Sequence, residues 1–352
     1  MDALPDAALS ALFGFIGGLA LGLAARRGRF CTLGAIEDAL YARDSRRLRM
    51  WALALAVAIL GTFLLEATAE LDLGQSLYAA SLWNPLESVA GGLIFGYGMA
   101  LAGNCGYGAL ARCGGGDLRS FVIVLVMGIS AYMAIAGPTA LLRRALFPEM
   151  PPAADLGQVA LAHRLARHFE VAPLLPALLA ALALAGWALS APAFRKARSQ
   201  LFWSLVVGLA IVWGWWSTSW LAAVSFEVLQ VDSYRFTAPL GETILYMMTA
   251  SGGGITFGVG AVAGVLTGAC LGSLSKGHFR WEACDDPREL GRQVFGAFLM
   301  GTGGVIAMGC SVGQGLTAFA MLAWSGPVTL AAIALGAAIG LRQLIRGFSP
   351  AA

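Results

Sequence analysis

Three of the six cysteines, Cys31, Cys105 and Cys310, stand beside glycines that interrupt apolar stretches of the chain. The three segments read RRGRFC (26–31), GNCGYG (103–108) and GCSVGQG (309–315). Each glycine costs a helix interior roughly 1 kcal/mol relative to alanine, so we expect helix breaks at these places. A helix that begins after a break offers unpaired N–H groups to an anion, and a neutral thiol adds a weak donor on a polarizable sulfur. The pattern predicts a passage that favours a soft, sulfur-bearing anion over a hard one.

The breaks around Cys105 and Cys310 are expected to be shaped by their small and polar neighbours. These neighbours are Gly103, Asn104, Gly106, Gly309, Ser311, Gly313 and Gln314. The alternative is that a free cysteine is only a small apolar residue, and this is our interpretation of Cys113, Cys270 and Cys284. No two cysteines have C-x-x-C spacing and only three histidines are present, which argues against a zinc site or a thioredoxin-like motif. We therefore expect no catalytic residue, no metal and no cofactor.

The elements that position these cysteines must be membrane helices. The chain has 352 residues, of which 58% are apolar and 12% are charged, about half the charged share of an ordinary soluble domain. This composition excludes a disordered chain, a DNA-binding domain and an ordinary cytosolic enzyme, and the net charge of +3 is too small to suggest a nucleic-acid partner. The fold class that remains is an all-α polytopic membrane protein, in which the lipid bilayer is the main environment.

Apolar runs of about 17–25 residues predict about nine transmembrane helices, with short re-entrant helices at the glycine-rich breaks. The predicted spans are 8–25, 50–69, 88–104, 120–142, 172–190, 201–220, 253–270, 292–309 and 326–344. If the N-terminus is outside, the inner loops hold 18 Lys and Arg residues and the outer loops hold 5. The positive-inside rule then places the N-terminus outside and the C-terminus in the cytoplasm. We treat residues 1–352 as a single transport domain.

Two similar sequence segments indicate that this domain contains an internal duplication. Residues 96–108 (GYGMALAGNCGYG) and 301–313 (GTGGVIAMGCSVG) share glycine, alanine and cysteine positions at an offset of 205. The first segment would enter the membrane from outside and the second from inside, so the pseudo-repeats 8–142 and 201–344 would be inverted and linked by 143–200. Inverted repeats with interrupted helices at matching positions are typical of transporters. Chance similarity between glycine-rich helices is the alternative.

Two further patterns concern helix packing rather than transport. Gly14, Gly18 and Gly22 are spaced four apart, as are Gly260, Gly264, Gly268 and Gly272, which predicts closely packed helix faces. The outer loop 143–171 contains an amphipathic stretch, QVALAHRLARHFE, that predicts an interfacial helix. We expect its histidines, His163 and His168, to face water or headgroups, and we interpret Glu66 as a surface carboxylate.

Four segments in order resemble the YeeE/YedE family of sulfur-transport domain proteins, which includes a bacterial thiosulfate importer. They are RFC (29–31), GNCGYG (103–108), the stretch from FRWE (279–282) to GR (291–292), and GCSVGQGL (309–316). The resemblance runs from about residue 14 to about residue 340, and the last segment is the most specific.

The resemblance implies an hourglass-shaped protein of the bacterial inner membrane, built from inverted repeats. It implies uptake of thiosulfate, with Cys31, Cys105 and Cys310 passing the ion inward through S–H···S hydrogen bonds. It also implies a small TusA/SirA-like sulfur carrier as cytosolic partner. Three alternatives stay open: transport of another sulfur or selenium compound, a membrane thiol–disulfide redox protein, and a channel for a small neutral solute.

Overall fold

The computed structural model describes residues 5–80, 82–148, 150–151, 153–225, 230–250, 254–282 and 286–347. Within these ranges the chain is helical, with isolated bridges between extended residues and no sheet. The helices are α1 (Asp6–Arg27), α2 (Thr32–Glu37), α3 (Arg46–Ala67), α4 (Pro85–Ala102), α5 (Gly106–Cys113), α6 (Leu118–Ile135), α7 (Pro138–Leu146), α8 (Leu156–Val159), α9 (Leu161–Phe169), α10 (Leu174–Leu189), α11 (Pro192–Lys196), α12 (Arg198–Val224), α13 (Thr237–Thr249), α14 (Phe257–Leu274), α15 (Pro287–Ile306) and α16 (Ser325–Arg346). Single π turns follow α2 (Asp38–Ala42) and precede α16 (Gly313–Ala318), and short 3₁₀ turns lie at Leu73–Gln75 and Leu77–Ala79.

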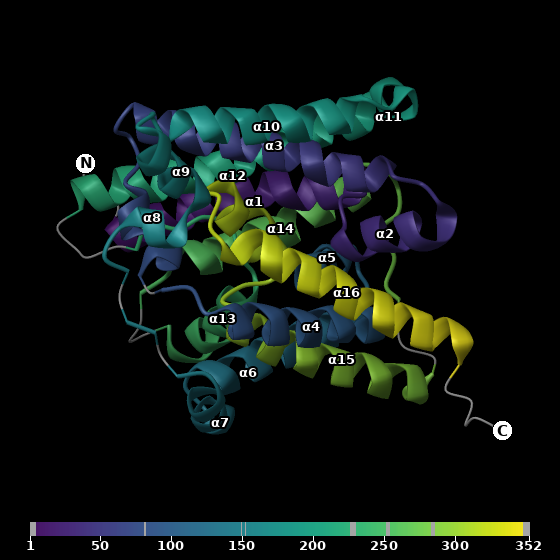
Figure 1. Ribbon diagram of the computed structural model, residues 1–352. Coiled ribbons are helices and arrows are strands. Elements are labelled where there is room, and N and C mark those ends of the chain that lie inside the picture. Colours follow the sequence, from purple (N-terminus) through teal and green to yellow (C-terminus); the bar gives the residue numbers. More distant parts are fainter. Residues whose placement is uncertain are drawn as a thin grey trace.

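The long helices lie side by side and form one bundle (Figure 1). Among the described residues, seven helical segments are long and apolar enough to cross a membrane: Asp6–Ala42, Arg46–Ala67, Pro85–Cys113, Leu118–Ile135, Arg198–Val224, Phe257–Leu274 and Ser325–Arg346. Helix α10 is apolar but has 16 residues, and α15 has 20 residues with charged side chains in its first turns. Each predicted span overlaps one of these helices. The all-α membrane class is confirmed, whereas the number nine and the duplication stay predictions.

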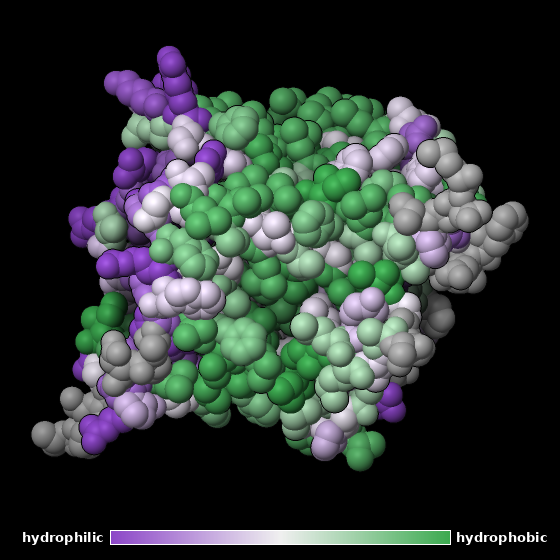
Figure 2. Space-filling view, turned by 180° about the vertical axis from the view of Figure 1, so that it is seen from behind, coloured by the Kyte–Doolittle hydropathy of each residue, from purple (hydrophilic) through white to green (hydrophobic). Residues whose placement is uncertain are grey.

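A broad apolar band separates two more polar ends of the bundle (Figure 2). Helices α1, α14 and α16 finish at one end, where α3, α12 and α15 begin; we call this the basic end. The predicted inner loops, with their basic residues, lie at this end, whereas α7, α9 and the start of α13, which carry or follow the arginines of the predicted outer loops, lie towards the opposite end. The bundle therefore has the charge asymmetry that the sequence predicted. Which end faces the cytoplasm stays a prediction.

Local sequence signals explain where the helices around the site begin and end. Asn84 caps α4 by accepting a hydrogen bond from the Leu86 amide, and Pro85 occupies the first helical position. Asp117 caps α6 in the same way, accepting from the Arg119 amide at 3.0 Å. Helix α4 ends at Gly103, whose φ of +74° is the left-handed conformation that glycine adopts without strain. The left-handed conformation of Gly103 therefore ends α4 and produces the break before Cys105.

Glycines bring the backbones of several helices into direct contact. Gly14, Gly18 and Gly22 of α1 face backbone atoms of α14, and Gly260, Gly264 and Gly268 of α14 face backbone atoms of α1. The predicted packing faces are therefore confirmed, and they pack against each other. Helix α4 packs against α15 in the same manner, with Gly98 opposite Gly296 and Gly91 opposite Gly303. In lipid, close backbone approach and the dispersion contacts that it permits hold helices together.

The amphipathic stretch of the outer loop forms α8 and α9, but one prediction for it was wrong. His163 does not face water: its side chain is 12% exposed and its Nε2 lies 2.7 Å from Glu66 Oε1 at the end of α3. Glu66 is therefore half-buried against α9 rather than a surface carboxylate. The error has a physical cause: Glu66, far from His163 in the sequence, supplies a hydrogen-bond partner that allows this histidine to be buried, and the local pattern around His163 does not show it. His168 is exposed, as expected.

Candidate functional site

Each of the three predicted cysteines stands at the start of a short helix after a break. Cys31 precedes α2, Cys105 precedes α5, and Cys310 precedes the helical segment that becomes the π turn Gly313–Ala318. Two residues before each cysteine the backbone takes a positive φ, at Arg29 (56°), Gly103 (74°) and Met308 (56°). This conformation is uncommon for arginine and methionine, and such backbone is typical of functional turns.

A glycine three residues after each cysteine completes the turn. The Gly108 amide donates a hydrogen bond to Cys105 Sγ at 3.3 Å, and the Gly313 amide donates to Cys310 Sγ at 3.5 Å. Gly34 holds the same place after Cys31. Because the sulfur accepts from the main chain at Cys105 and Cys310, the S–H proton of each is left to donate elsewhere.

The structure brings two of the cysteines together and places the third next to them. The side chains of Cys31 and Cys105 interact directly. Thr32 Oγ1 donates a hydrogen bond to Ser311 Oγ at 2.9 Å and lies 3.9 Å from Cys105 Sγ. Cys310 is the neighbour of Ser311, so three segments far apart in the sequence meet at one buried layer. We call Cys31, Thr32, Cys105, Cys310 and Ser311 the thiol layer.

The predicted supporting residues have different positions. Gly103 and Asn104 line a cavity at the basic end, whereas Gly309 lines a cavity towards the opposite end. Gly106 packs against Met127 of α6. The side chain of Gln314 bridges the break around Cys310, since its Nε2 donates a hydrogen bond to the Ala307 carbonyl at 2.7 Å. Its Oε1 is buried and has no hydrogen-bond partner among the described residues.

The basic-end cavity has a volume of about 320 Å³ and reaches Cys31. Four arginines from α1, the turn after it, α3 and α5 line this cavity, together with Glu37 and His278: Arg26, Arg29, Arg47 and Arg112. Its electrostatic character is therefore positive. A cavity of this kind attracts an anion and concentrates it beside the thiol layer.

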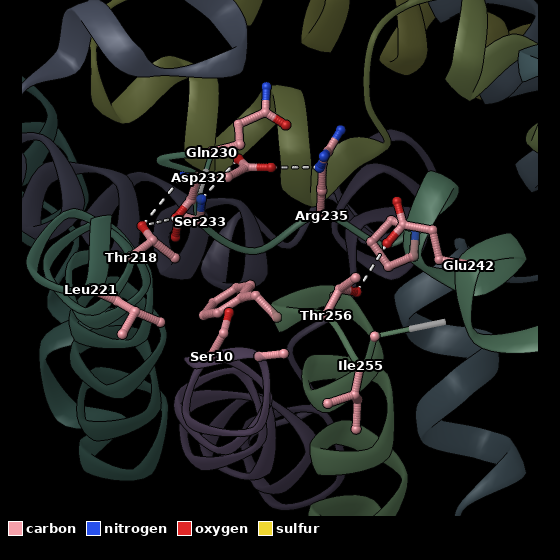
Figure 3. A pocket seen from close by; sticks show the side chains of 15 residues that line it. Ser10, Thr218, Leu221, Gln230, Asp232, Ser233, Arg235, Glu242, Ile255 and Thr256 are labelled. Carbon is pink, nitrogen blue, oxygen red and sulfur yellow. Dashed lines mark hydrogen bonds and ion pairs between the residues drawn. The ribbon is translucent and has the colours of Figure 1, made fainter. Parts of the chain in front are cut away.

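Besides an open hollow beside α8 and α9, two cavities towards the opposite end lie near the thiol layer. The larger, which we call the vestibule, has a volume of about 480 Å³ and is lined by the ends of α1, α12 and α14 and the residues before α13 (Figure 3). The smaller, which we call the arginine pocket, has a volume of about 190 Å³ and reaches Met308 and Gly309, directly before Cys310. Neither cavity shares a lining residue with the basic-end cavity. The thiol layer lies between them, and four of its five residues are less than 5% exposed.

Sequence reasoning missed two parts of this arrangement. Thr32 bridges Cys105 and Ser311, but a threonine beside a cysteine carries no signal of its own. Helix α13 and the segment before it were counted only as an outer loop. The available signal was Asp232 and Arg235, spaced three apart, which form an ion pair at 2.6 Å.

The remaining cysteines lie away from the thiol layer or outside the described residues. Cys113 ends α5 and Cys270 belongs to α14, and both are free and partly exposed. Cys284 lies outside the described residues. In the part of the chain that the structure describes, no group of three or more His, Cys, Asp or Glu side chains is placed to hold a metal ion.

Comparison with known proteins identifies the family. The family model described as Sulphur transport matches residues 27–339, which include every residue of the thiol layer. The thiosulfate transporter TsuA of Escherichia coli (strain K12) is 28% identical over 352 aligned residues, covering 92% of each chain. The thiosulfate transporter TsuA of Spirochaeta thermophila is 24% identical over 317 residues, covering 89% of this chain and 92% of the relative. The chain therefore belongs to the Sulphur transport family, and it is a multi-pass membrane transport protein rather than an enzyme.

Proposed function

We propose that the chain imports thiosulfate across the bacterial inner membrane through a pathway lined by Cys310, Cys105 and Cys31. The observation that carries the proposal is the thiol layer, where three cysteines at the starts of helices meet between cavities that reach in from the two ends. Both TsuA relatives are named as thiosulfate transporters and align along most of their length. Their similarity favours this substrate over other sulfur or selenium compounds.

The chemistry of the thiol layer suits a sulfur-bearing dianion. A neutral thiol donates a hydrogen bond to an oxygen or a terminal sulfur, whereas a thiolate would repel the ion and could not donate. At Cys105 and Cys310 the sulfur accepts a hydrogen bond from a main-chain amide, and this leaves the proton of a neutral thiol available to the ion. Replacement of cysteine by alanine removes this donor without removing the break in the backbone.

The order in which an imported ion would meet the cysteines follows from the predicted orientation of the chain in the membrane. If the basic end faces the cytoplasm, thiosulfate enters at the arginine pocket, passes Cys310, Cys105 and Cys31, and leaves beside Arg26, Arg27 and Arg29. We further propose that a small TusA/SirA-like sulfur carrier accepts the ion at this end. Removal of the ion by such a carrier would keep its free concentration low inside the cell and so sustain uptake.

The test is growth on thiosulfate as sole sulfur source in a strain that lacks its own sulfur uptake. The wild-type chain should restore growth, and Cys105→Ala and Cys310→Ala should abolish it while the proteins are still inserted. Cys270→Ala is the matched control, because Cys270 is a cysteine of α14 outside the thiol layer, and it should grow like the wild type. Normal growth of both Cys105→Ala and Cys310→Ala would refute the thiol pathway, and failure of the wild type would refute the substrate.

The contact between Cys31 and Cys105 supports one rival, a thiol–disulfide exchange function. In that case the two sulfurs would form a disulfide and release it again during turnover. Mass measurement of alkylated protein during transport distinguishes the two functions. A constant count of free thiols supports the transport pathway, and a reversible loss of two thiols supports the redox function.

A further inference from the structure

Two arginines line the arginine pocket, immediately before the thiol layer. Arg143 comes from α7 and Arg235 from the segment before α13. The rest of the wall is small or apolar and includes Thr237, Ala238, Gly304 and Met308. Guanidinium groups in a partly dehydrated pocket bind oxyanions strongly, because each offers several N–H donors and a permanent charge.

Arg235 connects this pocket to the vestibule, since it lines both. Its Nε lies 2.6 Å from Asp232 Oδ2, and the two side chains face each other at the rim of the vestibule (Figure 3). The two side chains are 21% and 10% exposed, so the pair is mostly dehydrated. A carboxylate at this position occupies a site that another anion of similar charge could take.

The stem of Arg235 also touches the Cys310 turn. A Cβ atom added to Gly313 would lie 3.0 Å from Arg235 Cβ, and Gly313 is the residue whose amide donates to Cys310 Sγ. The Cys310 thiol is additionally within hydrogen-bonding reach of the Phe236 backbone. An ion bound to Arg235 would therefore lie next to the turn that carries Cys310, the first thiol of the proposed pathway.

Thr237 supplies an independent sign that the arginine pocket binds a ligand. Its side chain is 2% exposed and lines the arginine pocket, and its Oγ1 is buried without a hydrogen-bond partner among the described residues. Buried hydroxyls are almost always paired, so an unpaired one that borders a cavity indicates a partner that the cavity receives. Thr237 also begins α13, a helix of 13 residues with no side-chain cap, so unpaired main-chain amides lie at the same place.

We propose that the arginine pocket is an oxyanion-binding site at which the transported ion docks before it reaches Cys310. Arg143 and Arg235 balance the two charges of a dianion, and Thr237 donates a hydrogen bond to one of its oxygens. The ion takes the place of Asp232 as the counter-charge of Arg235, so Asp232 competes with the substrate. This inference rests on the proposed function, because it assumes that the transported ion is a sulfur oxyanion.

The test is the concentration dependence of thiosulfate uptake into cells or proteoliposomes. Arg143→Gln and Arg235→Gln should each raise KM about ten- to a hundred-fold, because a hydrogen-bonded charge is lost, and Arg235→Lys should be intermediate. Arg144→Gln is the matched control: it removes the same charge from an exposed neighbour on α7 that lines neither cavity, and its KM should stay within twofold of wild type.

Asp232→Asn separates competition from a structural role. Asparagine keeps an oxygen that can accept from the Ser233 amide, as Asp232 Oδ1 does at 2.8 Å, but it removes the competing charge. KM should therefore fall, opposite to the arginine variants, whereas loss of structure would impair all variants alike. If Arg143→Gln and Arg235→Gln match Arg144→Gln, the site is refuted while the thiosulfate function stands.

If the wild type shows no thiosulfate uptake, the proposed function fails and direct binding decides the site. Purified wild type should then still bind sodium thiosulfate or sodium sulfate by titration calorimetry, and Arg235→Gln should bind it at least tenfold more weakly. Equal binding by the two proteins would overturn the proposed site.

Discussion

Gly98→Ala is the sharpest test of how the helices position the cysteines. A Cβ atom at Gly98 of α4 would lie 2.6 Å from the Gly296 carbonyl oxygen of α15 and 2.9 Å from the Met300 nitrogen. Nonbonded heavy atoms pack at about 3.5 Å, so the two backbones must separate by roughly 1 Å. Overpacking of this kind costs about 1–3 kcal/mol, and the better helix propensity of alanine returns about 1 kcal/mol.

Gly291→Ala on α15 is the control for this substitution. Nothing lies within 4 Å of a Cβ atom at Gly291, so this variant gains the helix propensity without the clash. In detergent, the unfolding midpoint of Gly98→Ala should lie about 2–12 °C below that of Gly291→Ala, because the two variants differ by the clash alone, at roughly 2–4 °C per kcal/mol. Thiosulfate uptake should also fall in Gly98→Ala alone, because α4 and α15 lead directly into the turns of Cys105 and Cys310. Equal midpoints and equal uptake would show that the α4–α15 contact neither limits stability nor positions the thiols.

Three other perturbations test separate contacts. Thr32→Val removes the hydroxyl that donates to Ser311 Oγ and should destabilise the protein by about 1 kcal/mol. A double-mutant cycle with Ser311→Ala should assign most of that loss to the interaction between the two residues. Additive losses in the cycle would count against the hydrogen bond. Glu66→Ala should lower the thermal midpoint by removing the partner of His163, with uptake retained, and a large loss of uptake would instead place this pair in the pathway. Gly304→Ala should narrow the arginine pocket, since its methyl group would lie 2.6 Å from Thr237 Oγ1, and should raise the KM for thiosulfate; an unchanged KM would show that the ion does not use this pocket.

The membrane helices were predictable because lipid imposes a simple rule on the sequence. A helix that crosses the bilayer must be long and apolar, and residues 50–69, 201–220 and 326–344 satisfy this rule without reference to anything distant in the chain. The glycine faces of α1 and α14 were predictable for a related reason, since small residues at every fourth position let two backbones approach closely; that these two faces pack against each other was not predicted. Helix α13 has 13 residues and contains Pro239 and Glu242, so it is too short and too polar for the same rule.

The candidate site was predictable only in part. Cysteine beside glycine marked the three turns, because both residue types have local conformational and chemical meaning. The bond between Thr32 and Ser311 joins residues 279 positions apart, and no local property of either residue predicts it. Arg235 was visible only as one charge in a loop, since the role proposed for it depends on Asp232, Thr237 and the turn of Cys310 meeting in space.

The thinness of the thiol layer has an electrical consequence. Cavities that admit water reach towards it from both ends, so a few buried side chains around Cys105 and Ser311 separate the two solutions. The membrane voltage must then drop mainly across this insulating plug rather than across the full width of the bilayer. One charge moved against 100 mV requires about 2.3 kcal/mol, and a dianion roughly twice that. On the proposed pathway, the passage of the ion between the thiols is therefore the step on which the voltage acts, and its entry through the arginine pocket is nearly free of it.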